Sequence, residues 1–173
     1  MVEAVILVVF PFCMLFAALS DWVSMTIANR VSVILVVTFA VIAPMTGMAW
    51  PEIGMHFAAA GLVLAVTFGL FAMGSMGGGD AKLLSATALW MGWNLSLVEY
   101  LAGSAVLGGI LTMVIISFRS TALSYFVTRS VFFRNFTQVA DGVPYGIALG
   151  VAGLITFPSS PLMLWTLERL TAI

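Results

Sequence analysis

Two aspartates stand at the edges of apolar runs in a chain that carries few charges. Asp21 closes the first run, in AALSDWVSMTIANRVS, and Asp80 follows three glycines in GSMGGGDAKLL. An ionisable residue at the edge of the hydrocarbon is costly and is a functional candidate by default. Two carboxylates held close together share one proton, so one can act as base and the other as acid. Such a pair could direct a water onto a peptide carbonyl without a metal or an organic cofactor.

The composition is that of a membrane protein. Hydrophobic residues make up 62% of the 173 residues and charged residues only 8%, against roughly 25% charged in soluble domains. Six uncharged runs are each close to or above the roughly 17 to 25 residues that a helix needs to cross a bilayer, and they lack the alternation of a membrane barrel. The runs are 4–20, 31–51, 53–79, 83–98, 100–118 and 142–167. We therefore predict one all-α domain over residues 1–173 with about six transmembrane helices.

The basic residues favour one end of these predicted spans. Five of the six fall on the same side when the connections alternate: Arg30, Lys82, Arg119, Arg129 and Arg134. The positive-inside rule makes that side cytoplasmic and places both termini outside. All three aspartates, Asp21, Asp80 and Asp141, then fall on the cytoplasmic side. Asp21 and Asp80 are thus expected at the same depth, where they can meet across the bundle.

Each residue of this pattern also has a purely structural interpretation. Asp80 could cap the fourth helix, and Asp21 could face water at a helix end. A cap does not need three glycines, however, whereas a backbone that approaches another chain closely does. Lys82 could pair with an acidic residue of a substrate, or it could be a snorkelling lysine that sets the topology, which is the simpler interpretation.

The remaining polar residues suggest membrane contacts rather than further chemistry. Segment 119–141 mixes arginines with aromatic residues and is predicted to be interfacial, between helices five and six, against anionic headgroups. Its few charges argue against nucleic acid as a partner. The lone Cys13 and the lone His56 do not suggest a metal site. Trp90 and Trp93 are expected to be interface anchors.

The residues around both aspartates resemble the GxGD aspartyl proteases of membranes and, among these, the type IV prepilin peptidases. In GGGDAKL, the residues that fit GxGD and its continuation are Gly77, Gly79, Asp80 and Lys82. The stretch SDWVSMTIANRVS is similar to the family's aspartate followed six residues later by Ile-Pro-Asn. Here Asp21 and Asn29 fit, while Ala28 replaces the commoner proline. A third stretch, GVPYGIALGVAG, resembles the family's Pro-Tyr-Gly segment and contributes Pro144 and Tyr145.

This resemblance implies catalysis by Asp21 and Asp80, with the other matching residues supporting the motifs or the substrate. The sequence has neither the zinc-binding insert nor the paired CxxC motifs of long prepilin peptidases. It is therefore similar to the short form that serves tight-adherence, or Flp-type, pili, which implies cleavage without N-methylation. The implied partners are prepilins and pseudopilins with a basic leader, the lipid bilayer and the pilus or secretion assembly machinery. The implied location is the bacterial inner membrane.

Two other classes of function stay open at this level. The chain could be a small transporter or channel subunit in which Asp21 and Asp80 bind a proton or a cation. Such sites are typical of broken helices near the midplane and of internal repeats, whereas these acids lie at the edge of the apolar runs. The chain could also be a structural subunit of a secretion machine, for which neither aspartate would be needed.

Overall fold

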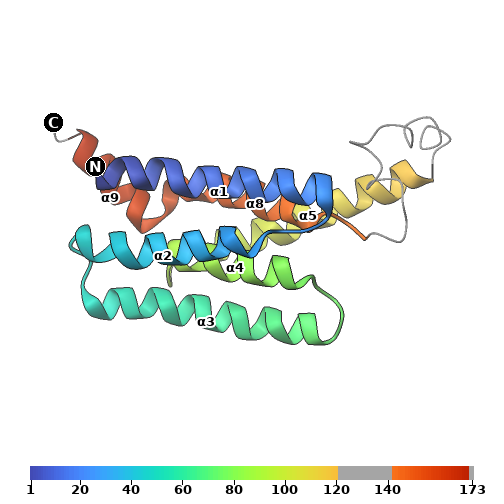
Figure 1. Cartoon of the computed structure of the whole chain (residues 1–173), viewed down its shortest axis with the longest axis horizontal. Helices are drawn as coiled ribbons and strands as arrows, with labels where there is room; N and C mark the ends of the chain where they lie inside the picture. Colours follow the sequence, from blue (N-terminus) through green and yellow to red (C-terminus); the bar gives the residue numbers. More distant parts are fainter. Residues whose placement is uncertain (121–141, 172–173) are drawn as a thin grey trace.

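Each of the apolar runs folds as helix, because a backbone in lipid must satisfy its own hydrogen bonds. The computed structural model describes residues 1–120 and 142–171, and all regular elements in this part of the chain are helical. The elements are α1 (Val2–Ser24), α2 (Asn29–Met45), α3 (Trp50–Ala72), α4 (Gly78–Met91), α5 (Leu95–Arg119), α8 (Tyr145–Thr156), the 3₁₀ turn η2 (Phe157–Ser159) and α9 (Pro161–Thr171). In Figure 1, α1 and α9 place the first and last described residues at the same end of the bundle.

The helices differ in whether they are long enough to cross a membrane. By length and composition α1, α3 and α5 qualify, and α8 with α9 forms a fourth candidate if this pair, bent by 46°, is one span. Helix α2 has 17 residues and is shorter than α1, α3 and α5. The chain is therefore a multi-pass membrane protein with three or four candidate spans in its described part, and the predicted count of six is not confirmed. The predicted orientation stays a prediction, and segment 119–141 lies outside the described residues from 121 onward.

Helix α4 lies inside the bundle rather than against lipid. Its 14 residues are about 21 Å long, well short of a hydrocarbon core of roughly 30 Å. Every residue from Leu83 to Met91 is buried, and α4 contacts α2, α3, α5 and α8. A helix that is apolar on all sides is expected to be buried on all sides. This burial explains why the fourth apolar run is the shortest. Asp80 is the third residue of α4, so the packing of this helix also holds Asp80 in place.

The break between α8 and α9 follows from two prolines. Pro158 and Pro161 flank Ser160, whose backbone is extended (φ −72°, ψ 148°). Proline lacks the N–H that a continuous helix would need at these positions, so the helix ends and restarts at an angle. An ion pair between Arg169 Nε and Glu3 Oε1, at 3.3 Å, joins α9 to the start of α1.

The prediction that Trp90 is an interface anchor is wrong. Its side chain is fully buried, and its Nε1–H donates to the Leu35 carbonyl oxygen at 3.0 Å. Burial of the indole among α4's neighbours is possible because this hydrogen bond satisfies its single donor. His56 is also buried, with Nδ1 2.7 Å from the Leu89 carbonyl oxygen. Trp93 is 54% exposed, and its anchoring role stays a prediction.

Candidate active site

Asp21 lies in the last turn of α1 and is 5% exposed. Helix α1 ends at Met25, which adopts the left-handed conformation (φ 53°) and donates its N–H to the Asp21 carbonyl oxygen at 2.9 Å. A left-handed residue after a helix is the usual way to stop it and turn the chain. The Ser20 hydroxyl donates to the Thr26 carbonyl oxygen at 2.8 Å and holds the turn that follows. The aspartate is thus positioned by a fixed helix end rather than by a free loop.

Asp80 is placed by the glycines that precede it. Gly77 is the N-cap residue of α4, so Asp80 is not the helix cap that one sequence interpretation allowed. The Asp80 carboxylate instead turns back toward the helix start, where it accepts a hydrogen bond from the Gly77 backbone. A Cβ atom on Gly77 would lie 2.7 Å from Asp80 Oδ2, and one on Gly79 would lie 3.2 Å from Ile27 Cβ. The glycines therefore admit both the aspartate and the turn after α1.

Both aspartates line one cavity. It measures about 710 Å³, and its lining includes residues from the end of α1 and the starts of α4 and α8. These helix ends lie at the same end of the bundle in Figure 1. Its wall also includes Met25, Gly77 and Tyr145. A second cavity of about 280 Å³ is again lined by both aspartates, and on this side also by Ile27. Two carboxyl groups from distant parts of the sequence therefore face the same space, as the alternation of the predicted spans required.

The electrostatics of Asp80 favour its neutral form. Asp80 precedes the apolar run 83–98 and belongs to none of the candidate spans. Burial raises its pKa to about 7, the charge of Asp21 acts in the same direction, and the Gly77 backbone hydrogen bond opposes them. Like charges that face one cavity cannot both ionise freely, so one proton is retained near neutral pH.

The start of α8 supplies a hydrogen bond to Asp21. The Gly146 N–H donates to Asp21 Oδ2 at 2.7 Å, and a Cβ atom at position 146 would lie 2.8 Å from Asp21 Cβ. This hydrogen bond holds the Asp21 carboxyl group in place at the cavity wall. Sequence reasoning named Pro144 and Tyr145 in this stretch but missed Gly146. The third residue of the Pro-Tyr-Gly stretch was the feature that could have revealed it.

Tyr145 is held against α5 at a position that lacks a side chain. Its hydroxyl donates to the Ser104 carbonyl oxygen at 3.0 Å. A Cβ atom on Gly108 would overlap Tyr145 Cε2, so any larger residue would collide with the ring. Gly108 thus admits the ring, the ring fixes the first residue of α8, and the next residue is the donor to Asp21. Sequence reasoning missed Gly108 because one glycine in an apolar helix does not reveal what packs against it.

Lys82 and Asn29 lie beside the cavity rather than in its wall. The Lys82 ammonium donates to Asn29 Oδ1 at 2.9 Å and joins the fifth residue of α4 to the first residue of α2. Both residues were selected from sequence as supporting ones, and this bond gives them a shared structural position. Pro144 is buried and directly precedes α8. Asp141 lies outside the described residues.

The site offers carboxylate chemistry. Within residues 1–120 and 142–171, no group of three or more histidine, cysteine or acidic side chains is arranged to hold a metal ion. The residues that face the cavity supply two carboxyl groups, each hydrogen-bonded to a backbone group, and the pKa of one of them, Asp80, is raised. A base and an acid on either side of a water are the minimum needed for direct attack on a peptide carbonyl.

Comparison with known proteins identifies a family to which the sequence is similar. The sequence model of the type IV leader peptidase family matches residues 8–113, more than half of the chain. The matched range includes Asp21, Asp80 and the glycines between α3 and α4, and it ends before α8. No curated protein and no solved structure matches the chain.

Proposed function

This chain belongs to the type IV leader peptidase family, and we propose that it is a membrane-embedded aspartic endopeptidase that uses Asp21 and Asp80 as its catalytic pair. It removes the basic leader from Flp-type prepilins and pseudopilins at the cytoplasmic face of the bacterial inner membrane. It leaves the new N-terminus unmethylated. The observation that carries this proposal is that both carboxyl groups line one cavity at a single end of the bundle. The family match favours a peptidase over a proton- or cation-coupled transporter, and no feature of the described residues favours the transporter.

The two aspartates have different roles in the proposed reaction. Asp21, which accepts the Gly146 N–H, is the ionised base and takes a proton from the attacking water. Asp80 is the protonated acid, and its proton passes to the scissile carbonyl oxygen as the C–O bond forms. In the second step the proton on Asp21 passes to the leaving amine as the C–N bond breaks. One hydroxyl proton of the intermediate returns to Asp80, so the pair regains its starting state.

The depth of the cavity suits a substrate that is itself a membrane helix. The cavity lies at the helix ends, where a prepilin passes from its basic leader into its apolar segment. Peptide bonds inside a helix are shielded by their own hydrogen bonds, so the substrate must become extended at the cut. The cavity of about 710 Å³ leaves room for such a segment. Selection of the bond by its depth then follows from where the aspartates lie.

The absence of methylation is supported by the cysteine content. These 173 residues contain one cysteine, Cys13, which is buried in α1, so the paired CxxC zinc motif of the long enzymes is not present in them. We expect purified protein in lipid nanodiscs to cleave an Flp-type prepilin once, at the junction of leader and apolar segment. Mass spectrometry of the product should show a free amine even with S-adenosylmethionine added. An uncut prepilin would contradict the peptidase, and a methylated product would contradict only the short-form assignment.

Activity should fall as the pH rises through about 7. Asp80 must carry its proton to act as the acid, and its pKa is raised to about 7. Above that pH the protonated fraction, and with it kcat/KM, should drop by roughly tenfold per pH unit. The measurement is the initial cleavage rate between about pH 6 and 9, with a substrate that has no titratable side chain beside the cut. A rate that is constant or rises over this range would exclude Asp80 as the acid.

A further inference from the structure

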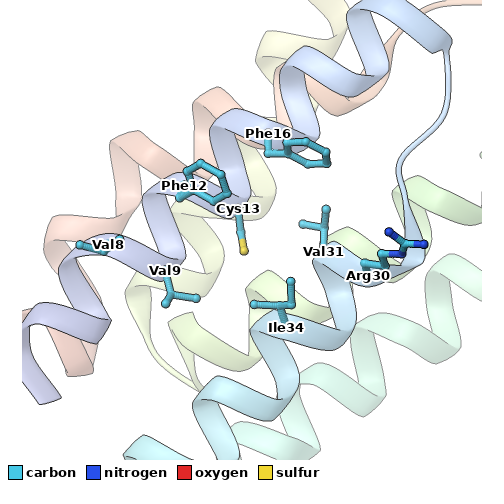
Figure 2. Close-up of a pocket in the computed structure, with 8 residues that line it drawn as sticks. All are labelled: Val8, Val9, Phe12, Cys13, Phe16, Arg30, Val31 and Ile34. Atoms are coloured by element: carbon cyan, nitrogen blue, oxygen red, sulfur yellow. The ribbon is translucent and has the colours of Figure 1, made fainter.

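A groove between α1 and α2 lies apart from the site of the aspartates. Figure 2 shows its lining, with five side chains from α1 and three from α2. Its volume is about 280 Å³, and it shares no lining residue with the two cavities that contain Asp21 and Asp80. A ligand here would therefore not touch the catalytic pair.

The groove is apolar along its length and opens on the outside of the bundle. Its floor includes Cys13 and Val31, which are buried, and its rim includes Val8 and Phe12, which are more than 60% exposed. From Val8 to Phe16 it follows α1 for about 12 Å. A helix with its side chains is roughly 10 to 12 Å wide, too wide for a groove of this size. An extended hydrocarbon chain is much thinner and fits this shape.

One charged residue stands at the end of the groove. Arg30 lies in the first turn of α2, beyond Phe16 and Val31 in Figure 2. No hydrogen bond or ion pair joins its exposed guanidinium to any other residue of the described part of the chain. A cation at a helix N-terminus is unfavourable because the helix dipole is positive there. Contacts with the described residues therefore do not explain this charge, and an anion from outside the protein would compensate for it.

We propose that this groove binds one anionic phospholipid, with its phosphate on the Arg30 guanidinium and an acyl chain along Phe12, Cys13 and Ile34. The donors of a guanidinium match a phosphate in a two-point contact. Anionic headgroups are the anions available at the depth where membrane helices end. The phosphate of the lipid thus contacts the charged residue at the end of the groove, and its acyl chain contacts the apolar floor.

Photocrosslinking tests this proposal without use of peptidase activity. The full chain is placed in phosphatidylcholine nanodiscs with a trace of phosphatidylglycerol that carries a diazirine in its acyl chain. A second sample contains phosphatidylcholine with the same diazirine. Peptide mapping should find the phosphatidylglycerol label on the groove segments of α1 and α2, in excess of the phosphatidylcholine label. In Arg30→Gln this excess should fall by roughly fivefold, because one basic residue near the surface is worth on the order of 1 kcal/mol.

Arg119→Gln is the matched control because it removes the same charge. Arg119 lies in the last turn of α5, at the same end of the bundle as the start of α2. The label of this variant on the groove should equal that of wild type, and Arg30→Lys should retain part of the excess. Equal labelling by both lipids would overturn the proposal, as would an excess that Arg30→Gln leaves intact. Loss of the label on addition of a prepilin would show that the groove receives the substrate instead.

Discussion

Asp21→Asn and Asp80→Asn should each reduce leader removal to the background rate, a loss on the order of 10⁴-fold or more. Asparagine keeps the size of the side chain but can neither accept the proton of the attacking water nor donate one to the carbonyl oxygen. Asp21 is buried and Asp80 partly so, and none of the other described residues that line the cavity carries a carboxyl group that could replace them. The measurement is the mobility shift of an Flp-type prepilin expressed together with each variant.

Glu99→Gln provides the matched control for this change of charge. Glu99 is an exposed carboxylate in α5 that lines neither aspartate cavity. The Glu99→Gln variant should process the prepilin at the wild-type rate. Processing that survives at more than a small fraction of the wild-type rate in either aspartate variant would remove that residue from the catalytic pair.

Gly108→Ala should have the second largest effect, although Gly108 lies outside the cavity wall. The new methyl group would overlap the Tyr145 ring at Cε2, so the ring must move. Tyr145 begins α8, and Gly146 beside it donates to Asp21 Oδ2. A displacement of about 1 Å at a catalytic group can cost on the order of 10²-fold in rate. We expect a loss of that size in the cleavage rate of the purified variant.

Two further variants separate this mechanism from a general loss of folding. Gly109→Ala adds the same methyl group one position later, where no described residue beyond its chain neighbours and its own helix backbone lies within 4 Å, and should retain the wild-type rate. In Gly108→Ala with Tyr145→Ala the collision is gone, so the double variant should be as active as Tyr145→Ala alone. If the double variant instead combines both losses, the methyl group acts through something other than the ring.

The positions of the helices could be predicted from sequence, but their surroundings could not. Six apolar runs were enough to predict an all-helical membrane protein, since charges seldom occur inside such helices. An apolar face that packs on protein looks the same in the sequence as one that meets lipid. For that reason Trp90 was assigned to the interface although α4 is buried by its neighbours. Burial also explains why a 14-residue helix can be stable there without crossing the bilayer.

The candidate site was partly predictable for a similar reason. The alternation of spans was enough to bring Asp21 and Asp80 to the same end of the bundle, and the glycine run pointed to a close approach. That approach is made by Ile27 of the same chain. Gly146 and Gly108 act only through α8 and its packing on α5. Contacts between residues so distant in sequence leave no local pattern, and a glycine does not reveal which atom occupies the space beside it.

In the proposed mechanism, Asp21 and Asp80 act as one catalytic unit on the same bond. Single-turnover cleavage by purified wild type, Asp21→Asn, Asp80→Asn and the double variant, followed for many hours in nanodiscs, tests it most directly. Residues that serve one step lose nearly all their contribution when either is removed. We therefore expect the double variant to cleave as slowly as either single variant and no more slowly. Losses that multiply in the double variant, or a single variant that retains activity, would contradict it.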